Sequence, residues 1–405
     1  MTLEQKQIPY KIEKVNMRCY GDKPASFLKM QPNGNIPVAE IDGVIYNQSN
    51  DILYSLEELF PNHESLVCSK DSSADERDRF QRMLRLERQL FGAWMYWLTG
   101  PAGTGGKRNQ EQFIQVLRIV EEELKQVSDK KGFFMGDRVT MVDFMFAPFL
   151  ERTVASLLFY KGFQIRVSSE EYDTTEFYHV NKWFDAMESL SSYRLTKSDY
   201  YTHCWDLPPQ LGGCSFEPDS AKPYEEAING IRNLNGQGGS WEFPLLPHNG
   251  GVEPDWSWCN DVNMAQLEAV ERLSYNHEAI VAFASRGAGK KGMPPVMAPL
   301  SDPNAVSNPN VSISVDAILK IVCHVMLLQE SELGVSDERM AMEVLLKNII
   351  SKWEQDENAF ELKKGVVDSL VYLRDRIGVP RDMRLPAARL LRANLNWALG
   401  VILDA

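Results

Sequence analysis

The sequence predicts a small mixed α/β unit followed by two mostly helical regions, and three observations support this fold class. An apolar hairpin pattern surrounds an Asp-Gly pair within the first 60 residues. Helical periods with capping signals begin near residue 73, and they resume near residue 263 after a stretch rich in Gly, Pro and Trp. Alternating apolar residues are typical of strands, whereas apolar residues three or four apart are typical of amphipathic helices. The chain therefore combines α/β and all-α parts.

The first 60 residues alternate short strands and helices. Asp42 and Gly43 favour a two-residue turn, because both tolerate the left-handed backbone that such a turn requires. Pro61 then stops the last helix of this part. The predicted elements are a strand at 10–15, a short helix at 24–30, hairpin strands at 38–41 and 44–46, and a helix at 48–60.

Residues 73–204 read as a helical domain. Ser73 and Glu76 form a capping-box pattern, in which hydroxyl and carboxylate each accept from a free backbone amide. Thr140 and Asp143 form a similar pattern before a segment, residues 144–158, that is apolar enough to be buried on all sides. Between these two helix starts, one apolar stripe recurs at helical spacing: Phe113, Val116, Leu117, Val120, Leu124 and Val127.

The rest of the chain divides into an irregular and a helical stretch. Residues 205–262 are rich in Gly, Pro and Trp, which predicts a packed connecting wrap with one helix, at 224–234. The abundant tryptophans argue against a disordered linker. Predicted helices follow at 264–284, 315–328, 337–352, 358–377 and 387–403. The predicted domains are 1–62, 73–204, the wrap 205–262 and the helical extension 263–405.

Charge and composition disfavour several classes of function. The 405 residues carry a formal net charge of −13, which argues against nucleic acid and anionic membrane surfaces, since both are bound by clustered Lys and Arg. No apolar run approaches the roughly 18–20 residues that span a bilayer, so an integral membrane protein is not expected. The polar N-terminus does not resemble a signal or transit peptide. The six scattered cysteines indicate reduced thiols.

The order of short patterns in the first part resembles the glutathione S-transferase superfamily. The stretch "NIPV", the hairpin and "QS" at a helix start occur in the order typical of that family, and the resemblance covers roughly residues 4–204. It is most similar to the cysteine-using, omega-like branch. The extra C-terminal domain and the segment "SDYYTHCWDLPPQLGGC" are similar to the iota type of plants, algae and cyanobacteria. The resemblance implies a thioredoxin-like N-terminal unit and an all-helical glutathione transferase C-terminal domain.

This resemblance implies a glutathione site built from five residues. Pro37 matches the family's cis-proline, which leaves the backbone of Ile36 free to pair with the cysteinyl part of glutathione. Gln48 and Ser49 match the pair that holds the γ-glutamyl end, and free amides with a hydroxyl at a helix start suit a carboxylate. Lys23 falls where omega-like members place a lysine near the glycyl carboxylate. Each also has a plain interpretation, as an edge-strand proline, a helix cap or a solvated loop charge.

Two departures from the family pattern bear on function. Omega-like members carry Glu where this chain has Gln48. The family's first strand and its catalytic residue would lie before Met1 in this numbering, so the N-terminal unit is predicted to be incomplete and no residue here takes the catalytic position. Cys19 is the nearest candidate nucleophile, with a structural or incidental thiol as the alternative.

Other residues give weaker signals. Trp94 and Trp97 lie where the family forms its co-substrate pocket, although aromatic residues at helical spacing are more often core. His203, Cys204 and Cys214 fall short of a tetrahedral metal set, so no metal site is predicted.

The leading hypothesis is a glutathione S-transferase-like protein of the cysteine type, in the lineage of thiol transferases and glutathione-dependent reductases. Its cofactor would be glutathione, its assembly a homodimer or a larger complex, and its location the cytoplasm or the plastid stroma. The alternative hypothesis is a non-catalytic scaffold or assembly subunit with the transferase shape. A third hypothesis is that residues 73–204 bind a tetrapyrrole or another hydrophobic ligand.

Overall fold

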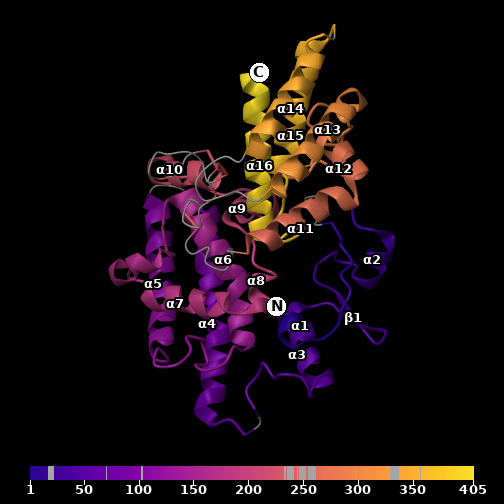
Figure 1. Ribbon diagram of the computed structural model, residues 1–405. Coiled ribbons are helices and arrows are strands. Elements are labelled where there is room, and N and C mark those ends of the chain that lie inside the picture. Colours follow the sequence, from indigo (N-terminus) through magenta and orange to yellow (C-terminus); the bar gives the residue numbers. More distant parts are fainter. Residues whose placement is uncertain are drawn as a thin grey trace. The chain divides into compact units, whose positions relative to one another are not determined.

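The computed structural model divides the chain into two units, Met1–Glu225 and Glu226–Ala405 (Figure 1). The residues that it describes are 1–16, 22–69, 71–101, 104–231, 234, 241–243, 245, 252–253, 261–296, 298–328, 337–355 and 357–405. The α/β part followed by two helical regions agrees with the element order predicted from the sequence. The finer division of the chain into four segments stays a prediction.

The N-terminal α/β part confirms the predicted hairpin and the helices beside it. Within the described residues its sheet has two antiparallel strands, with Ala39 opposite Tyr46. The turn residues Asp42 and Gly43 have φ values of 49° and 81°, as a tight two-residue hairpin turn requires. The elements are α1 (Thr2–Gln5), α2 (Ala25–Met30), β1 (Ala39–Ile41), β2 (Val44–Tyr46) and α3 (Ser49–Leu59).

The strand predicted at residues 10–15 is wrong. This stretch pairs with no strand among the described residues, and the side chains of Tyr10 and Ile12 are 45% and 68% exposed. A strand is stable only where a neighbour supplies the partner groups of its ladder. Because the described residues offer no such neighbour here, the apolar alternation does not produce a strand.

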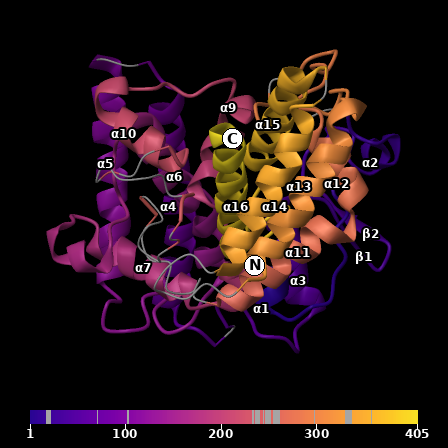
Figure 2. The ribbon, with the colours of Figure 1, turned by 45° about the horizontal axis from the view of Figure 1, so that its top comes forward.

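The rest of the first unit is helical. Helices α4, α5 and α6 run side by side in both views (Figures 1 and 2), and α9 packs along α6. The predicted caps are present at Ser73, whose hydroxyl accepts from the Glu76 amide at 3.1 Å, and at Thr140. The elements are α4 (Ala74–Thr99), α5 (Thr104–Lys125), α6 (Met141–Lys161), the 3-10 helix η2 (Ser169–Thr174), α7 (Tyr178–Glu188), α8 (Ser191–Arg194), α9 (Tyr200–Leu211) and α10 (Pro218–Ile228).

The buried start of α6 is held by one carboxylate. Asp143 accepts from the Thr140 amide at 2.8 Å and from the Phe134 amide and the Trp183 indole at 3.0 Å each. Burial raises the pKa of Asp143, and the hydrogen bonds oppose that rise only in part. Because Trp183 belongs to α7, this single side chain fixes α6 against α7 as well as capping it.

The prediction of an irregular wrap from residue 205 is wrong for its first part. Residues 205–211 continue α9 through Pro208, and α10 begins before the predicted helix at 224–234. Proline lacks the N–H that would bond to the carbonyl four residues earlier. That carbonyl, on Cys204, accepts instead from the Tyr160 hydroxyl at 2.7 Å. The buried tyrosine thus satisfies the group that Pro208 leaves open, and the helix persists. Most of residues 232–260 lie outside the described residues.

The second unit is a helical bundle around α16. Helices α11, α13, α14 and α15 all pack against α16, and Figure 2 shows the bundle side by side. Asn276 leaves the helical conformation, with φ −135°, and splits the helix predicted at 264–284 into two. The elements are α11 (Val262–Tyr275), α12 (His277–Ala284), the 3-10 helix η5 (Pro309–Val311), α13 (Ser312–Met326), α14 (Asp337–Trp353), α15 (Ala359–Asp375) and α16 (Leu385–Asp404).

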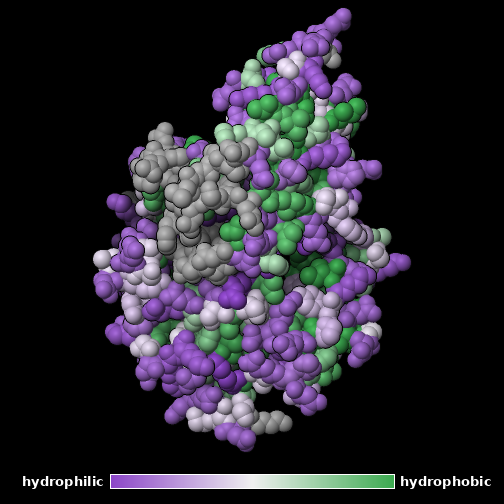
Figure 3. All heavy atoms as spheres, in the orientation of Figure 1, coloured by the Kyte–Doolittle hydropathy of each residue, from purple (hydrophilic) through white to green (hydrophobic). Residues whose placement is uncertain are grey.

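One segment of this unit, Pro309–Met326, is long and apolar enough to cross a membrane by length and composition alone. It is not an uninterrupted apolar run, since it contains Asp316 and Lys320. Its apolar side chains Val315, Ile318 and Val322 are fully buried in the core of the bundle, which is how the central helix of a globular fold packs. The outer surface of the bundle is also partly apolar, and Figure 3 shows hydrophobic side chains over α14, where Val344 is 57% exposed.

Candidate functional site

The hairpin register places the predicted glutathione residues at one end of the sheet. Ala39 is paired with Tyr46. Pro37 precedes Ala39 by two residues and Gln48 follows Tyr46 by two, so both lie just beyond the same end of the ladder. The peptide bond between Ile36 and Pro37 is cis, in agreement with the prediction. Ile36, Pro37 and Gln48 are all exposed. The structure therefore brings these residues together at an open surface.

The start of α3 provides backbone donors at the same end. Gln48 is the residue that precedes the helix, with an extended backbone at φ −121° and ψ 136°. Its carbonyl accepts the first helical bond, from Ile52 at 2.9 Å. Its side chain makes no capping hydrogen bond, and the Ser49 side chain is exposed. The amides of the first turn and the Ser49 hydroxyl can thus donate to an anionic group.

Buried polar contacts hold α3 in place at both of its ends. The Gln31 side chain is buried and its amide donates to the Asn47 carbonyl at 3.3 Å, directly before Gln48. At the other end of α3, the ammonium group of the buried Lys6 pairs with Glu57 at 2.9 Å. Nothing in the local sequence pattern indicated Gln31, because its role depends on a contact with Asn47 sixteen residues later.

Lys23 lies beside the loop that leads to Ile36. A Cβ added at Gly34 would lie 3.4 Å from the Lys23 side-chain carbons, so the lysine stem crosses this loop closely. Its ammonium group donates to the Asn16 carbonyl and lies 5.2 Å from the centre of the Phe27 ring. Lys23 is therefore close in space to the other predicted residues, with its cation held on the protein.

Asp51 adds a negative charge that the sequence analysis did not consider. It lies in the first turn of α3, two residues after Ser49. An acidic residue three positions after a helix cap is a recognisable sequence signal. The first turn thus combines free amides with a carboxylate, an arrangement that suits a ligand carrying both a carboxylate and an ammonium group.

Three of the described cysteines lack the features of a reactive nucleophile. Burial raises the pKa of the Cys214 thiol to about 12 and that of Cys323 to about 11, and it also raises the pKa of Cys68. A nucleophilic cysteine needs the opposite shift, since the thiolate is the reacting form. Cys19, the predicted candidate nucleophile, lies outside the described residues.

The remaining candidates occupy the interior of the first unit. Trp94 and Trp97 are 1% and 2% exposed, and the Trp94 indole donates to the Ser156 hydroxyl at 3.0 Å. Side chains buried this deeply cannot contact a co-substrate, so the prediction that they line a pocket is corrected to core packing. His203 lies 3.2 Å from a Glu151 oxygen. Within the described part of the chain, no three His, Cys, Asp or Glu side chains gather as metal ligands would.

Two stretches of the first unit match models of one protein family. Residues 1–59 match the family model described as glutathione S-transferase, N-terminal domain, and residues 104–186 match the model of the C-terminal domain. Glutathione S-transferase DHAR2 of Arabidopsis thaliana is 27% identical over 198 residues, which cover 49% of this chain and 80% of that protein. Probable glutathione S-transferase DHAR2, chloroplastic, of Oryza sativa subsp. japonica is 22% identical over 193 residues, covering 48% and 61%.

A solved structure is also similar to part of this chain. Dehydroascorbate reductase from Chlamydomonas reinhardtii matches 47% of this chain and 78% of its own, with 23% identity and a TM-score of 0.37. The family matches confirm the predicted fold class, with a thioredoxin-type N-terminal unit carrying a small sheet, a helical C-terminal domain and a further helical region. Both family matches end before the second unit begins.

Proposed function

On the premise that the first half of this chain carries both domains of the glutathione S-transferase superfamily, we propose that it binds glutathione at the start of α3. The γ-glutamyl carboxylate accepts from the first-turn amides and the Ser49 hydroxyl, and its ammonium group is close to Asp51. The backbone of Ile36 pairs with the cysteinyl part, and Lys23 attracts the glycyl carboxylate. We place the chain in the cysteine-type, omega-like and iota-like branch.

One observation carries this proposal. The register of the hairpin sets Pro37 and Gln48 at the same end of the sheet, next to the helix start with its unpaired first-turn amides. Glutathione is an extended molecule with a zwitterionic end, a central amide backbone and a second carboxylate. The exposed groups offer a partner to each of these parts in that order, without a change in the fold.

For its activity we propose glutathione-dependent thiol transfer or reduction. In this chemistry a protein thiolate attacks the sulfur of a glutathionylated substrate, which releases the substrate thiolate and leaves a protein–glutathione disulfide. The thiolate of a second glutathione then attacks that disulfide, which restores the protein thiolate and forms glutathione disulfide. Cys19 is the thiol that we would test first, because burial raises the pKa values of Cys68, Cys214 and Cys323.

The same pKa shifts favour a second candidate function. A protein whose thiols stay protonated can keep a glutathione-binding surface as a non-catalytic scaffold or assembly subunit. In both cases we expect a homodimer or a larger complex, and a location in the cytoplasm or in the plastid stroma, where one relative is named as chloroplastic.

Calorimetric titration with glutathione tests the binding proposal. We expect Ser49→Ala to weaken binding about tenfold, as the loss of a hydrogen bond to a carboxylate does. Ser55→Ala is the matched control, because it removes a hydroxyl from the same helix away from its start. The proposal is wrong if both variants bind equally well, or if the wild-type chain binds no glutathione at millimolar concentration.

A coupled assay separates enzyme from scaffold. Glutathione-dependent reduction of dehydroascorbate and of a small mixed disulfide is measured for the wild-type chain and for Cys19→Ser. Turnover that the Cys19→Ser variant abolishes supports the thiol transferase. Glutathione binding without turnover supports the scaffold, and a pull-down with size measurement would then identify its assembly.

A further inference from the structure

The second unit contains a cleft that belongs to none of the predicted sites. Its volume is about 570 Å³, and it is lined by residues 229–231, residues 241–243 and the facing sides of α15 and α16. Pockets that bind small molecules are typically about 300–1,000 Å³ and are mostly apolar with a few placed polar groups. All the lining residues lie in the second unit, beyond the residues that match the transferase family.

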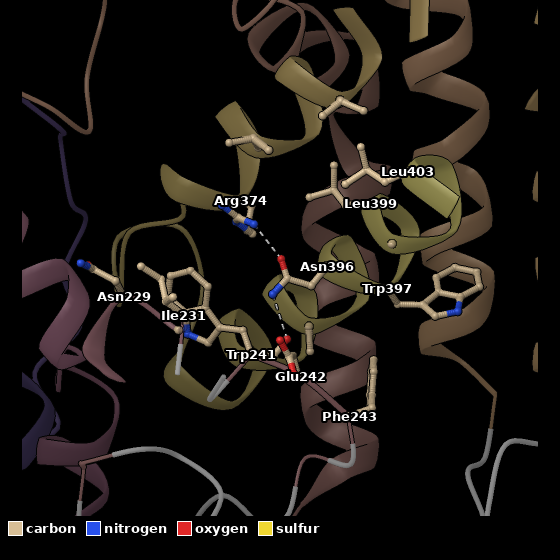
Figure 4. Close-up of a pocket in the computed structure, with 15 residues that line it drawn as sticks. Asn229, Ile231, Trp241, Glu242, Phe243, Arg374, Asn396, Trp397, Leu399 and Leu403 are labelled. Atoms are coloured by element: carbon tan, nitrogen blue, oxygen red, sulfur yellow. Dashed lines mark hydrogen bonds between the residues drawn. The ribbon is translucent and has the colours of Figure 1, made fainter. Parts of the chain in front are cut away.

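Most of the cleft wall is apolar and aromatic. Figure 4 shows the Trp241 ring on one side of Arg374 and the side chains of Leu399 and Leu403 on the other. Trp241 is 5% exposed, whereas Leu403, close to the end of α16, is 62% exposed. The cleft is therefore aromatic and buried at Trp241 and apolar and open to solvent at Leu403. It can accommodate a flat apolar group about the size of a ring.

Arg374 supplies a cationic donor inside this wall. Its Nε donates to Asp375 and its Nη1 donates to the Asn396 side chain, both at 2.8 Å. Asn396 in turn donates to the Trp241 carbonyl at 3.1 Å, as the dashed lines in Figure 4 show. The Nη2 group of Arg374 donates to no described residue, and the side chain is 23% exposed. The guanidinium is thus fixed in orientation with one edge free to meet a ligand.

Two further arginines lie on aromatic rings of the cleft wall. The Arg392 guanidinium lies 4.8 Å from the centre of the Trp241 ring, and that of Arg339 lies 3.9 Å from the centre of the Phe243 ring. Glu242 is the one carboxylate among the lining residues, and it is exposed. The Arg374 guanidinium attracts a negative charge, and the apolar wall strengthens this attraction by excluding water.

We propose that this cleft binds a small amphipathic anion, a molecule with an aromatic or alicyclic body and one carboxylate or sulfonate group. The anionic group accepts from Nη2 of Arg374. The apolar body packs between Trp241 and the side chains of Leu399 and Leu403. This site is independent of the glutathione site proposed at α3.

Two fluorescent probes with the same kind of aromatic body test both parts of the proposal on the full chain. Anilinonaphthalene sulfonate is anionic, and phenylnaphthylamine is neutral. Arg374→Met keeps an unbranched apolar stem and removes the guanidinium with its charge. We expect this variant to bind the anionic probe about tenfold more weakly, as the loss of a hydrogen bond to a charged group does. Its affinity for the neutral probe should change less than about twofold.

A second variant blocks the cleft without disturbing the polar contacts. Gly400 lines the cleft, and a Cβ added there meets no atom within 4 Å. Gly400→Leu should therefore fold. Its leucine side chain should occupy the space of the probes and lower the affinity for both of them about tenfold or more. Gly92→Leu is the matched control, because Gly92 is also helical with open space around it but lies in α4 of the first unit.

The outcomes separate clearly. If Gly400→Leu loses binding of both probes and Gly92→Leu binds them as the wild type does, the cleft is supported as the site. If Arg374→Met loses binding of the anionic probe alone, the role of the charge is supported. Equal binding by the wild-type chain and Gly400→Leu, or absence of probe binding, overturns the site, and equal weakening of both probes by Arg374→Met overturns the anion preference. Thermal unfolding of each variant verifies that it is folded.

Discussion

The two units differ in how their most buried cations are held. In the first unit, buried cations pair with buried carboxylates. Arg166 lies 2.8 Å from Glu188, which also accepts from Lys197, and all three side chains are almost entirely buried. Lys6 pairs with Glu57 in the same manner at 2.9 Å.

In the second unit, several arginines lie on aromatic rings. Ion pairs occur there too, as between Arg384 and Glu268 at 2.7 Å, and Arg166 of the first unit also lies 4.4 Å from the centre of the Phe184 ring. The Arg376 guanidinium is 3.6 Å from the centre of the Tyr372 ring, and that of Arg339 is 3.9 Å from the centre of the Phe243 ring. Stacking on a ring face stabilises a cation without using the edge of the guanidinium. Arg374, which lies in the cleft, pairs with Asp375 through Nε and keeps Nη2 as a donor for an external anion. In the first unit, by contrast, Arg166 and Lys197 both donate to Glu188.

The largest effect is expected in the first unit. Glu188→Ala leaves Arg166 and Lys197 as buried charges without their shared carboxylate, which should lower the free energy of unfolding by about 3–5 kcal/mol. Urea unfolding followed by hydrogen exchange and mass spectrometry measures this loss in each unit separately. We expect exchange in α13 and α16 to stay unchanged.

The matched control for this variant is Glu176→Ala. Glu176 pairs with Arg118 at the exposed surface, where ion pairs contribute little, so its removal should leave unfolding as in the wild type. If Glu188→Ala unfolds no earlier than Glu176→Ala, buried ion pairs do not stabilise the first unit.

Acid should act on the first unit through the same carboxylate. Burial raises the pKa of Glu188, but the charges of Arg166 and Lys197 outweigh that effect and leave it below its usual value. A carboxyl with a lowered folded pKa contributes stability above its unfolded pKa of about 4.3. This stability is lost as the pH falls through the folded pKa. Urea midpoints between pH 7 and 3 should therefore fall more steeply for the wild type than for Glu188→Ala, and parallel curves would contradict this.

A comparison of two capping boxes should give the next largest effect. Asp143→Ala leaves the amides of Phe134 and Thr140 and the Trp183 indole buried without an acceptor, which should cost about 3 kcal/mol. Glu171→Ala removes the same kind of cap at an exposed site, where its carboxylate accepts from Ser168, and should cost about 1 kcal/mol or less. Denaturant unfolding measures the free energy of unfolding of both variants. Equal decreases would show that burial does not change what these caps contribute to stability.

Arg376→Met tests the stacked arginines of the second unit. Among the described residues Arg376 has no carboxylate partner, and its hydrogen bonds to the Tyr372 and Pro299 carbonyls are long, at 3.4 and 3.3 Å. Since methionine keeps much of the contact with the ring, we expect the free energy of unfolding to fall by about 1 kcal/mol. Hydrogen exchange in α15 measures this change. A loss as large as that of Glu188→Ala would remove the contrast between the units.

The smallest effect should be a gain. Gly400→Leu replaces glycine inside α16 where the added side chain meets open space, and the better helix former should raise the unfolding free energy by about 0.5–1 kcal/mol. Gly92→Leu in α4 should give a similar gain. Thermal unfolding compares the two, and a loss in Gly400→Leu alone would mean that the cleft space is not open.

The sequence by itself determined the local elements and the candidate residues at the start of α3. The Asp42-Gly43 turn, the caps at Ser73 and Thr140 and the end of α3 depend on residues close in the chain. Backbone hydrogen bonds within a helix or a tight turn have short range, so the pattern of a few neighbouring residues is enough to predict them. The candidate residues from 36 to 49 are likewise close in sequence, and one hairpin brings them together.

Only the tertiary structure decided the features that depend on distant partners. Residues 10–15 have the pattern of a strand but no neighbour for a ladder, whereas α9 passes Pro208 because the Tyr160 hydroxyl satisfies the Cys204 carbonyl. Trp94 and Trp97 have the spacing of either a core or a pocket, and packing placed them in the core. The cleft at Arg374 joins side chains from residues 229 to 403. A cavity exists where side chains that are distant in the sequence leave the space between helices unfilled. No local sequence pattern can predict such a cavity.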